Sequence, residues 1–178
     1  GRHIPKGAVI FYREQTWKQT PNETMAKEIL ELSSGEEITL SVADPSIFNS
    51  NGGSTIGDDF NRAGLYFKAA DNERKSGWVQ YRSRFRPSET AAPPMLYLFD
   101  NLSYMIQTIA SAPIDKKKAE DLDTQCEDHG LDAGRYLLME NLLVQTAYFT
   151  PPVHATKGVI HIQSLIDKHR ADRNRTKI

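Results

Sequence analysis

Short apolar segments alternate with segments of helical periodicity along most of this chain, and this alternation constrains its fold more than any other feature. The apolar segments are rich in β-branched and aromatic residues, as strands are. We expect strands at residues 7–13, 37–43, 65–68 and 95–99. We expect helices at residues 22–34, 54–63, 71–85, 101–110 and 127–146. Strands that alternate with helices predict an α/β fold with a mixed or parallel sheet flanked by helices.

Local signals predict where several helices begin and end. Residues 20–23 (TPNE) have the pattern of a capping box, with Thr20 as the N-cap and Glu23 three residues later. Gly64 is expected at the C′ position of the helix before it. Asp71-Asn72 and Asp100-Asn101 can cap the helices that follow them. A polar stretch at residues 111–125, which holds three consecutive lysines, is expected to be a solvated connection.

Composition limits the class of protein. A length of 178 residues suits one domain with a substantial core, and we assign residues 1–150 to it and residues 151–178 to a C-terminal extension. The net charge of −1 means that any binding to nucleic acid must come from local basic patches. The single cysteine, Cys126, excludes an internal disulfide and fits a reducing cytoplasm. No apolar run reaches the roughly 18 residues that a membrane span needs.

Asp44 is the first candidate for chemistry. It follows the apolar segment 37–43, and Pro45 ends the strand directly after it. In α/β sheets ligands gather at the carboxyl ends of strands, where a carboxylate can hold a divalent ion. The alternative interpretation is a turn formed by the Asp-Pro dipeptide.

The second candidate is the cluster Asp128, His129 and Asp132. Spacings of three and four residues place these side chains on neighbouring positions of one helical face. Two carboxylates at this spacing repel each other, so a bound cation would stabilise them. The alternative is that acids in the first turn simply complement the helix dipole.

A basic helical face is a third candidate. Arg74, Trp78 and Arg82 share a face of the expected helix, with Lys75 and Arg84 beside them. Basic residues next to an aromatic ring suit contact with DNA phosphates. A solvated face with one packed Trp is the alternative. The chain has no Walker A sequence, so it carries no ATPase motif of its own.

Taken together, these segments resemble the C-terminal nuclease domain of phage and prophage terminase large subunits. The resemblance extends from about residue 4 to about residue 146 and rests on the order and spacing of its motifs. The matching segments are 43–48 (ADPSIF), 70–74 (ADNER) with Gly77-Trp78, 95–100, Asp123-Thr124 and 127–136 (EDHGLDAGRY).

The resemblance implies a ribonuclease H-like fold in which acids hold Mg²⁺ or Mn²⁺ for hydrolysis of phosphodiester bonds. Asp44 matches the acid at the end of the fourth strand, and Asp128, His129 and Asp132 match the final helix. Asp44, Asp128 and Asp132 would be catalytic, and two metal ions would activate water and stabilise the leaving oxygen. The implied partners are double-stranded DNA, the terminase small subunit and the portal, in the cytoplasm of a bacterial host.

The resemblance also implies a further Asp on a first strand, in a hairpin that precedes Gly7. Residues 1–6 hold no acid, so we expect this chain to lack that carboxylate and its hairpin. The strand at 37–43 would then have an open edge, through which the chain could self-associate. Three alternatives stay open: a metal-dependent endonuclease, a catalytically inactive prophage remnant or DNA-binding module of packaging, and an unrelated α/β binding protein whose acids are caps and turns.

Overall fold

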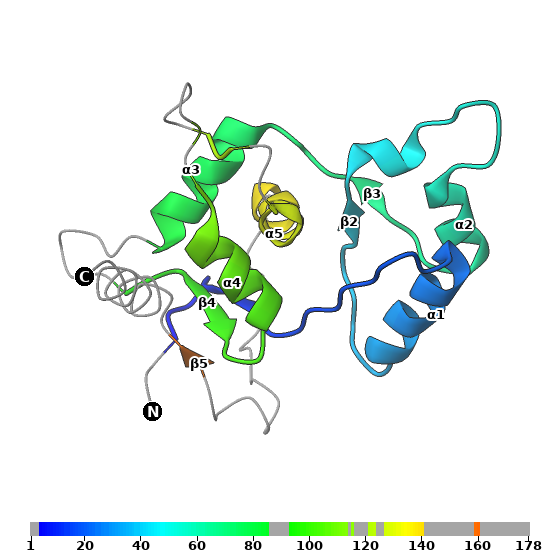
Figure 1. The fold of residues 1–178 in the computed structure, drawn as a ribbon. Coiled ribbons are helices and arrows are strands. Elements are labelled where there is room, and N and C mark those ends of the chain that lie inside the picture. Colours follow the sequence, from blue (N-terminus) through cyan, green and yellow to red (C-terminus); the bar gives the residue numbers. More distant parts are fainter. Residues whose placement is uncertain are drawn as a thin grey trace, which may run out of the picture. The chain divides into compact units, whose positions relative to one another are not determined.

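The computed structural model describes residues 4–85, 93–113, 115, 121–123 and 127–140, and the backbone of residues 159–160. The chain forms two compact units. Unit 1 contains Gly1–Glu14 and Arg74–Ile178, and unit 2 contains Gln15–Glu73. Each unit combines helices with short strands (Figure 1), so the expected mixed α/β class is confirmed. The proposed boundary at residue 150 lies outside the described residues.

Unit 1 is built on a three-stranded sheet in the order β1-β4-β5. Its strands are β1 (Val9–Phe11), β4 (Leu96–Phe99) and β5 (Val159–Ile160). The strands β1 and β4 pair in parallel, with Val9 opposite Leu96, and β5 pairs antiparallel to β4. The expected strands at 7–13 and 95–99 are therefore confirmed, each with fewer residues.

Three helices complete unit 1: α3 (Arg74–Phe85), α4 (Ser103–Ser111) and α5 (His129–Met139). The helix α5 contacts both α3 and α4 (Figure 1). Apolar side chains from these helices and from β1 and β4 pack together in one core. The buried members of this core are Phe11, Trp78, Tyr81, Leu96, Leu98, Leu102, Met105, Leu131 and Leu138.

Unit 2 contains α1 (Asn22–Leu32), β2 (Val42–Ala43), the 3-10 helix η1 (Pro45–Phe48), α2 (Ile56–Arg62) and β3 (Lys68–Ala69). The strands β2 and β3 form a parallel pair, with Val42 opposite Lys68. The buried core of this unit is small and consists of Ala26, Phe60 and Leu65.

The predicted helix ends are partly wrong. Pro21 is the N-cap of α1, with no side-chain cap, because the Thr20 hydroxyl donates to the Lys18 carbonyl instead. A capping box does occur in unit 2, between Thr55 and Asp58 of α2. The prediction for Gly64 is confirmed: its φ is +86°, and it follows the C-cap of α2.

The helices α3 and α4 both begin later than expected. The Asp71 carboxylate accepts from the Glu73 amide, and α3 starts at Arg74. Leu102, and not Asp100 or Asn101, is the N-cap of α4. Its side chain is almost fully buried, so core packing fixes where this helix starts.

The strand expected at 37–43 is also shorter than predicted. Only Val42–Ala43 is strand, and Ile38 is 53% exposed, so the alternating apolar pattern there does not mark a buried face. The described residues form two small sheets and show no ribonuclease H-like sheet. Among the described helices, none has the length and apolar character that crossing a membrane requires.

Candidate functional site

Three carboxylates of unit 1 converge on the guanidinium group of Arg74, the first residue of α3. Its Nε lies 3.1 Å from Asp121 Oδ1. Its Nη1 lies 3.3 Å from Asp128 Oδ2 and 3.6 Å from Asp132 Oδ2. We call Arg74, Asp121, Asp128 and Asp132 the acidic cluster. Each of these carboxylates is no more than 20% exposed, so the solvent screens their charges only partly.

Asp121 is the member of the acidic cluster that the sequence does not predict. Its Oδ1 accepts hydrogen bonds from Arg74 Nε, from the indole Nε1 of Trp78 at 2.8 Å and from the Leu122 amide at 2.8 Å. It belongs to the polar stretch expected to be solvated, 47 residues from Arg74 in the chain. Several acids lie near it in the sequence, including Glu120 and Asp123, so spacing alone does not single out Asp121.

The ionisation of the acidic cluster follows from these contacts. Burial raises the pKa of Asp121, but the hydrogen bonds from Trp78, the Leu122 amide and Arg74 outweigh it and hold that pKa below its usual value. For Arg74, burial lowers the pKa, and the neighbouring carboxylates outweigh burial and raise it. Asp121 is therefore a carboxylate, and Arg74 a cation, at neutral pH.

The structure separates the predicted trio on α5. Asp128 is the N-cap of the helix and Asp132 lies in its first turn, and both face Arg74. His129 points away from Arg74: its side chain is 86% exposed, and its Nε2 lies 3.9 Å from Glu127 Oε1. Tyr104 donates to the same Glu127 oxygen at 2.6 Å.

Asp44 lies in unit 2, where it directly follows β2 as predicted. It is the N-cap of η1, and its Oδ1 accepts from the Ser46 amide at 2.7 Å. This is the turn geometry of the alternative interpretation. The prediction that Asp44 shares a divalent ion with the residues on α5 stays a prediction.

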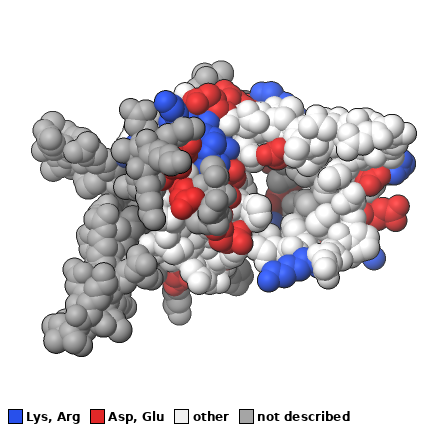
Figure 2. Space-filling view, turned by 45° about the horizontal axis from the view of Figure 1, so that its top comes forward, with Lys and Arg blue, Asp and Glu red and all other residues white. Residues whose placement is uncertain are grey.

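The four basic residues expected to contact DNA all lie on α3 and differ in exposure. Arg74 is engaged by carboxylates, and its guanidinium lies over the Trp78 ring, 5.4 Å from the centroid. Lys75 and Arg82 are exposed, and Arg84 is half-buried. Figure 2 shows acidic and basic side chains next to one another among the described residues, as the net charge leads one to expect.

Comparisons with protein-family models, with curated proteins and with solved structures found no match for this chain. The acidic cluster must therefore be interpreted from its own geometry. Among the described residues, no three His, Cys, Asp or Glu side chains are arranged as a preformed metal site. Each of the three carboxylates forms an ion pair with the Arg74 guanidinium.

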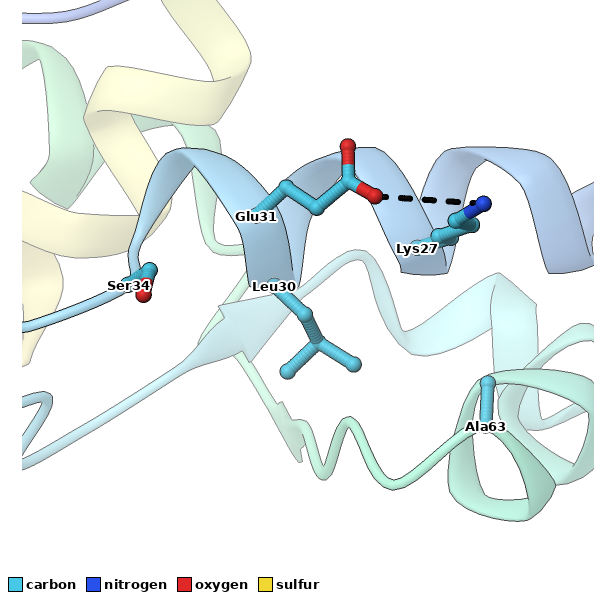
Figure 3. Close-up of a pocket in the computed structure, with 5 residues that line it drawn as sticks. All are labelled: Lys27, Leu30, Glu31, Ser34 and Ala63. Atoms are coloured by element: carbon cyan, nitrogen blue, oxygen red, sulfur yellow. Dashed lines mark ion pairs between the residues drawn. The ribbon is translucent and has the colours of Figure 1, made fainter.

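An open hollow occurs in unit 2, on the C-terminal half of α1 (Figure 3). It is lined by Lys27, Leu30, Glu31, Ser34 and Ala63. Lys27 Nζ and Glu31 Oε1 are 3.9 Å apart and both are well exposed, so this ion pair contributes little. The hollow contains none of the predicted site residues.

Proposed function

We propose that this chain is the metal-dependent endonuclease domain of a terminase large subunit, with a ribonuclease H-like fold, and that it cuts concatemeric phage DNA during packaging. The family is suggested by the order and spacing of the motifs in the sequence. The acidic cluster supports the chemistry, because Asp128 and Asp132, two of the acids that the resemblance assigns to catalysis, face one nitrogen atom of Arg74.

That convergence on Arg74 Nη1 is the observation that carries the proposal. Asp128 Oδ2 and Asp132 Oδ2 lie 3.3 and 3.6 Å from this one nitrogen, which bears positive charge. Residues four apart on a helix can both reach one cation, and here they do so. A divalent ion that replaced the guanidinium would find two carboxylate oxygens directed at it, and Asp121 beside them.

The donor set of this position fits Mg²⁺ or Mn²⁺. Both are hard cations that prefer carboxylate oxygens, and Mg²⁺ is commonly held by one or two carboxylates together with water. Asp128 and Asp132 would hold the ion, with Asp44 as the further carboxylate that the resemblance assigns. When bound, such ions supply charge stabilisation and an activated water for phosphodiester hydrolysis. Lys75, Arg82 and Arg84 would contact DNA phosphates.

An inactive DNA-binding or packaging module is the second candidate. It is favoured by one observation: Arg74 already forms ion pairs with both carboxylates and occupies the position where the ion would bind. In that case the acidic cluster would act as a structural ion-pair network that joins α3 to α5. A further consequence would be DNA binding without cleavage.

A plasmid-nicking assay in Mn²⁺ separates these functions. We expect the wild-type chain to convert supercoiled plasmid to nicked circles, and Asp132→Asn and Asp44→Asn each to reduce the rate at least ~100-fold. Asp100→Asn, an exposed acid outside the cluster, is the matched control and should keep the wild-type rate. Equal nicking by wild type and Asp132→Asn contradicts the nuclease assignment. Binding of DNA without any nicking supports the inactive module.

A further inference from the structure

Among the described residues, Arg135 on α5 is the largest side chain that is almost completely buried, with 1% of its surface exposed. Burying a guanidinium is unfavourable unless the charge is paired and hydrogen-bonded. Its Nε lies 3.0 Å from Asp132 Oδ1. Its guanidinium lies over two aromatic rings, 4.7 Å from the centroid of Tyr136 and 5.4 Å from that of Trp78.

The backbone of α3 closes the space around Arg135. A Cβ atom at Gly77 would overlap the Cγ and Cδ of Arg135, so glycine at this position lets the helix lie directly on the arginine stem. The two rings hold the guanidinium and the helix holds the stem. Arg135 therefore has little freedom to turn away from Asp132.

The pairing also leaves Arg135 Nη1 without a hydrogen-bond partner in the described part of the chain. An unpaired buried donor destabilises the folded state. A gain in stability is thus a poor explanation for this arginine. What the arrangement does provide is a fixed orientation for one carboxylate.

That carboxylate belongs to the acidic cluster, and its two oxygens face different partners. Asp132 Oδ1 accepts from Arg135, and Asp132 Oδ2 faces the position of Arg74 Nη1. Outer hydrogen bonds of this kind orient metal-ligating carboxylates, and their loss typically weakens metal binding 10–100-fold.

We propose that Arg135 is a positioning residue that fixes Asp132 so that its Oδ2 faces the divalent cation; this inference rests on the proposed function. Arg135 acts through Asp132 and does not itself touch the ion. A double-mutant cycle can separate this role from a general effect on the fold, because only a residue that acts through Asp132 loses its effect once Asp132 is gone.

The cycle compares wild type, Arg135→Lys, Asp132→Asn and the double variant by calorimetric titration with Mn²⁺. We expect Arg135→Lys to lower Mn²⁺ affinity ~10–100-fold, since lysine keeps the charge but lacks the Nε–H donor at that place. The double variant should bind Mn²⁺ no more weakly than Asp132→Asn alone. The proposal would be overturned if Arg135→Lys left the Mn²⁺ affinity unchanged. It would also be overturned if the losses of Mn²⁺ binding free energy in the two single variants added in full in the double variant.

A second measurement uses the metal-free protein and keeps Arg135 intact, so it does not depend on whether an Arg135 variant folds. In the metal-free protein, the NMR signal of the Arg135 Nε–H should move in Asp132→Asn and stay in place in Asp100→Asn. An Arg135 signal that does not respond to Asp132→Asn contradicts the inference, whatever the titrations show. Absence of Mn²⁺ binding by wild type contradicts the proposed function, and with it the role of Arg135 toward the ion, and the signal then reports only the contact between Arg135 and Asp132.

Discussion

Arg74 competes with metal ions for the same carboxylates if the proposed function holds. Replacing it by glutamine removes the resident positive charge and leaves three acids facing one another. We therefore expect Arg74→Gln to bind Mn²⁺ at least about tenfold more tightly than wild type. Calorimetric titration measures the change. Lys75→Gln removes the same charge from the next, exposed residue and is the matched control. Affinity that is equal or weaker in Arg74→Gln would show that the guanidinium does not lie at the ion's position.

Asp121 should make stability depend on acidic pH. Its pKa in the folded state lies below the ordinary 3.8, so its contribution is present above that value and is lost as the pH falls through the folded pKa. Asp121→Asn should lower the free energy of unfolding by about 1–3 kcal/mol at neutral pH, because three donors lose a charged acceptor. Urea denaturation should show that the difference in unfolding free energy between wild type and Asp121→Asn becomes smaller as the pH falls below 3.8, the ordinary pKa of Asp. A difference that is the same at neutral and strongly acidic pH would contradict this assignment.

At the scale of elements, a residue far away in the chain caps α4. The N-cap residue Leu102 offers no acceptor, and the Glu14 carboxylate takes that place. It accepts from the Tyr104 amide at 2.8 Å and from the Met105 amide at 2.9 Å. Glu14→Ala leaves two donors in the first turn unpaired, and we expect a loss of about 1–2 kcal/mol in urea denaturation. Glu37→Ala, in an exposed segment, should change stability by less than about 0.5 kcal/mol. Equal effects of the two variants would exclude a capping role for Glu14.

The close packing of α5 against α3 and β1 depends on Gly134. A Cβ atom there would overlap the Tyr81 hydroxyl and come within 2.9 Å of Phe11 Cε2. Tyr81 cannot move aside easily, because it is buried and donates to the Leu131 carbonyl at 3.0 Å. We expect Gly134→Ala to lower the melting temperature and to cost about 1–3 kcal/mol. Gly53→Ala meets only open space and serves as the control. An unchanged melting temperature in Gly134→Ala would contradict this packing.

Elements with a strong local signal could be predicted from the sequence, and pairings between distant segments could not. The apolar run at Leu96–Phe99 is strand because every one of its residues is suited to a covered sheet. The alternation at 37–43 predicts a strand equally well, but a strand also needs a partner, which the local pattern cannot supply. The long-range cap from Glu14 is missed for the same reason.

The candidate site shows the same limit. The spacing of Asp128 and Asp132 correctly predicts that they share one face, because helical geometry is local. Nothing local indicates that Arg74 lies between them or that Asp121 joins them. These contacts arise because α3 packs against α5 and Asp121 accepts a hydrogen bond from Trp78. The polar sequence at residues 111–125 predicts a solvated connection, because polarity alone does not reveal that Asp121 accepts a hydrogen bond from the buried Trp78.

At the scale of the whole molecule, the two units contribute different things. Unit 1 carries the larger core and the acidic cluster, and unit 2 carries Asp44 and a small core. The strand β2 has only two residues, so an edge of this length is a weak template for pairing with another chain. Self-association through it stays a prediction. The metal site that we propose lies in unit 1, where a divalent cation would bind between Asp128 and Asp132.

Terbium luminescence tests for this cation, because Trp78, one of the two tryptophans of the chain, lies at the acidic cluster. Trp78 stacks under Arg74, whereas Trp17 belongs to unit 2, where it donates to Glu28. Tb³⁺ prefers the same oxygen ligands as Mg²⁺ and Ca²⁺ and emits when a nearby excited tryptophan transfers energy to it. We predict emission on excitation of tryptophan in wild type and in Trp17→Phe, its loss in Trp78→Phe, and its displacement by Mn²⁺. The Asp128→Asn and Asp132→Asn variants should each bind Tb³⁺ at least ~10-fold more weakly. Emission that persists in Trp78→Phe, or full affinity in both Asp variants, would contradict a metal site at this position.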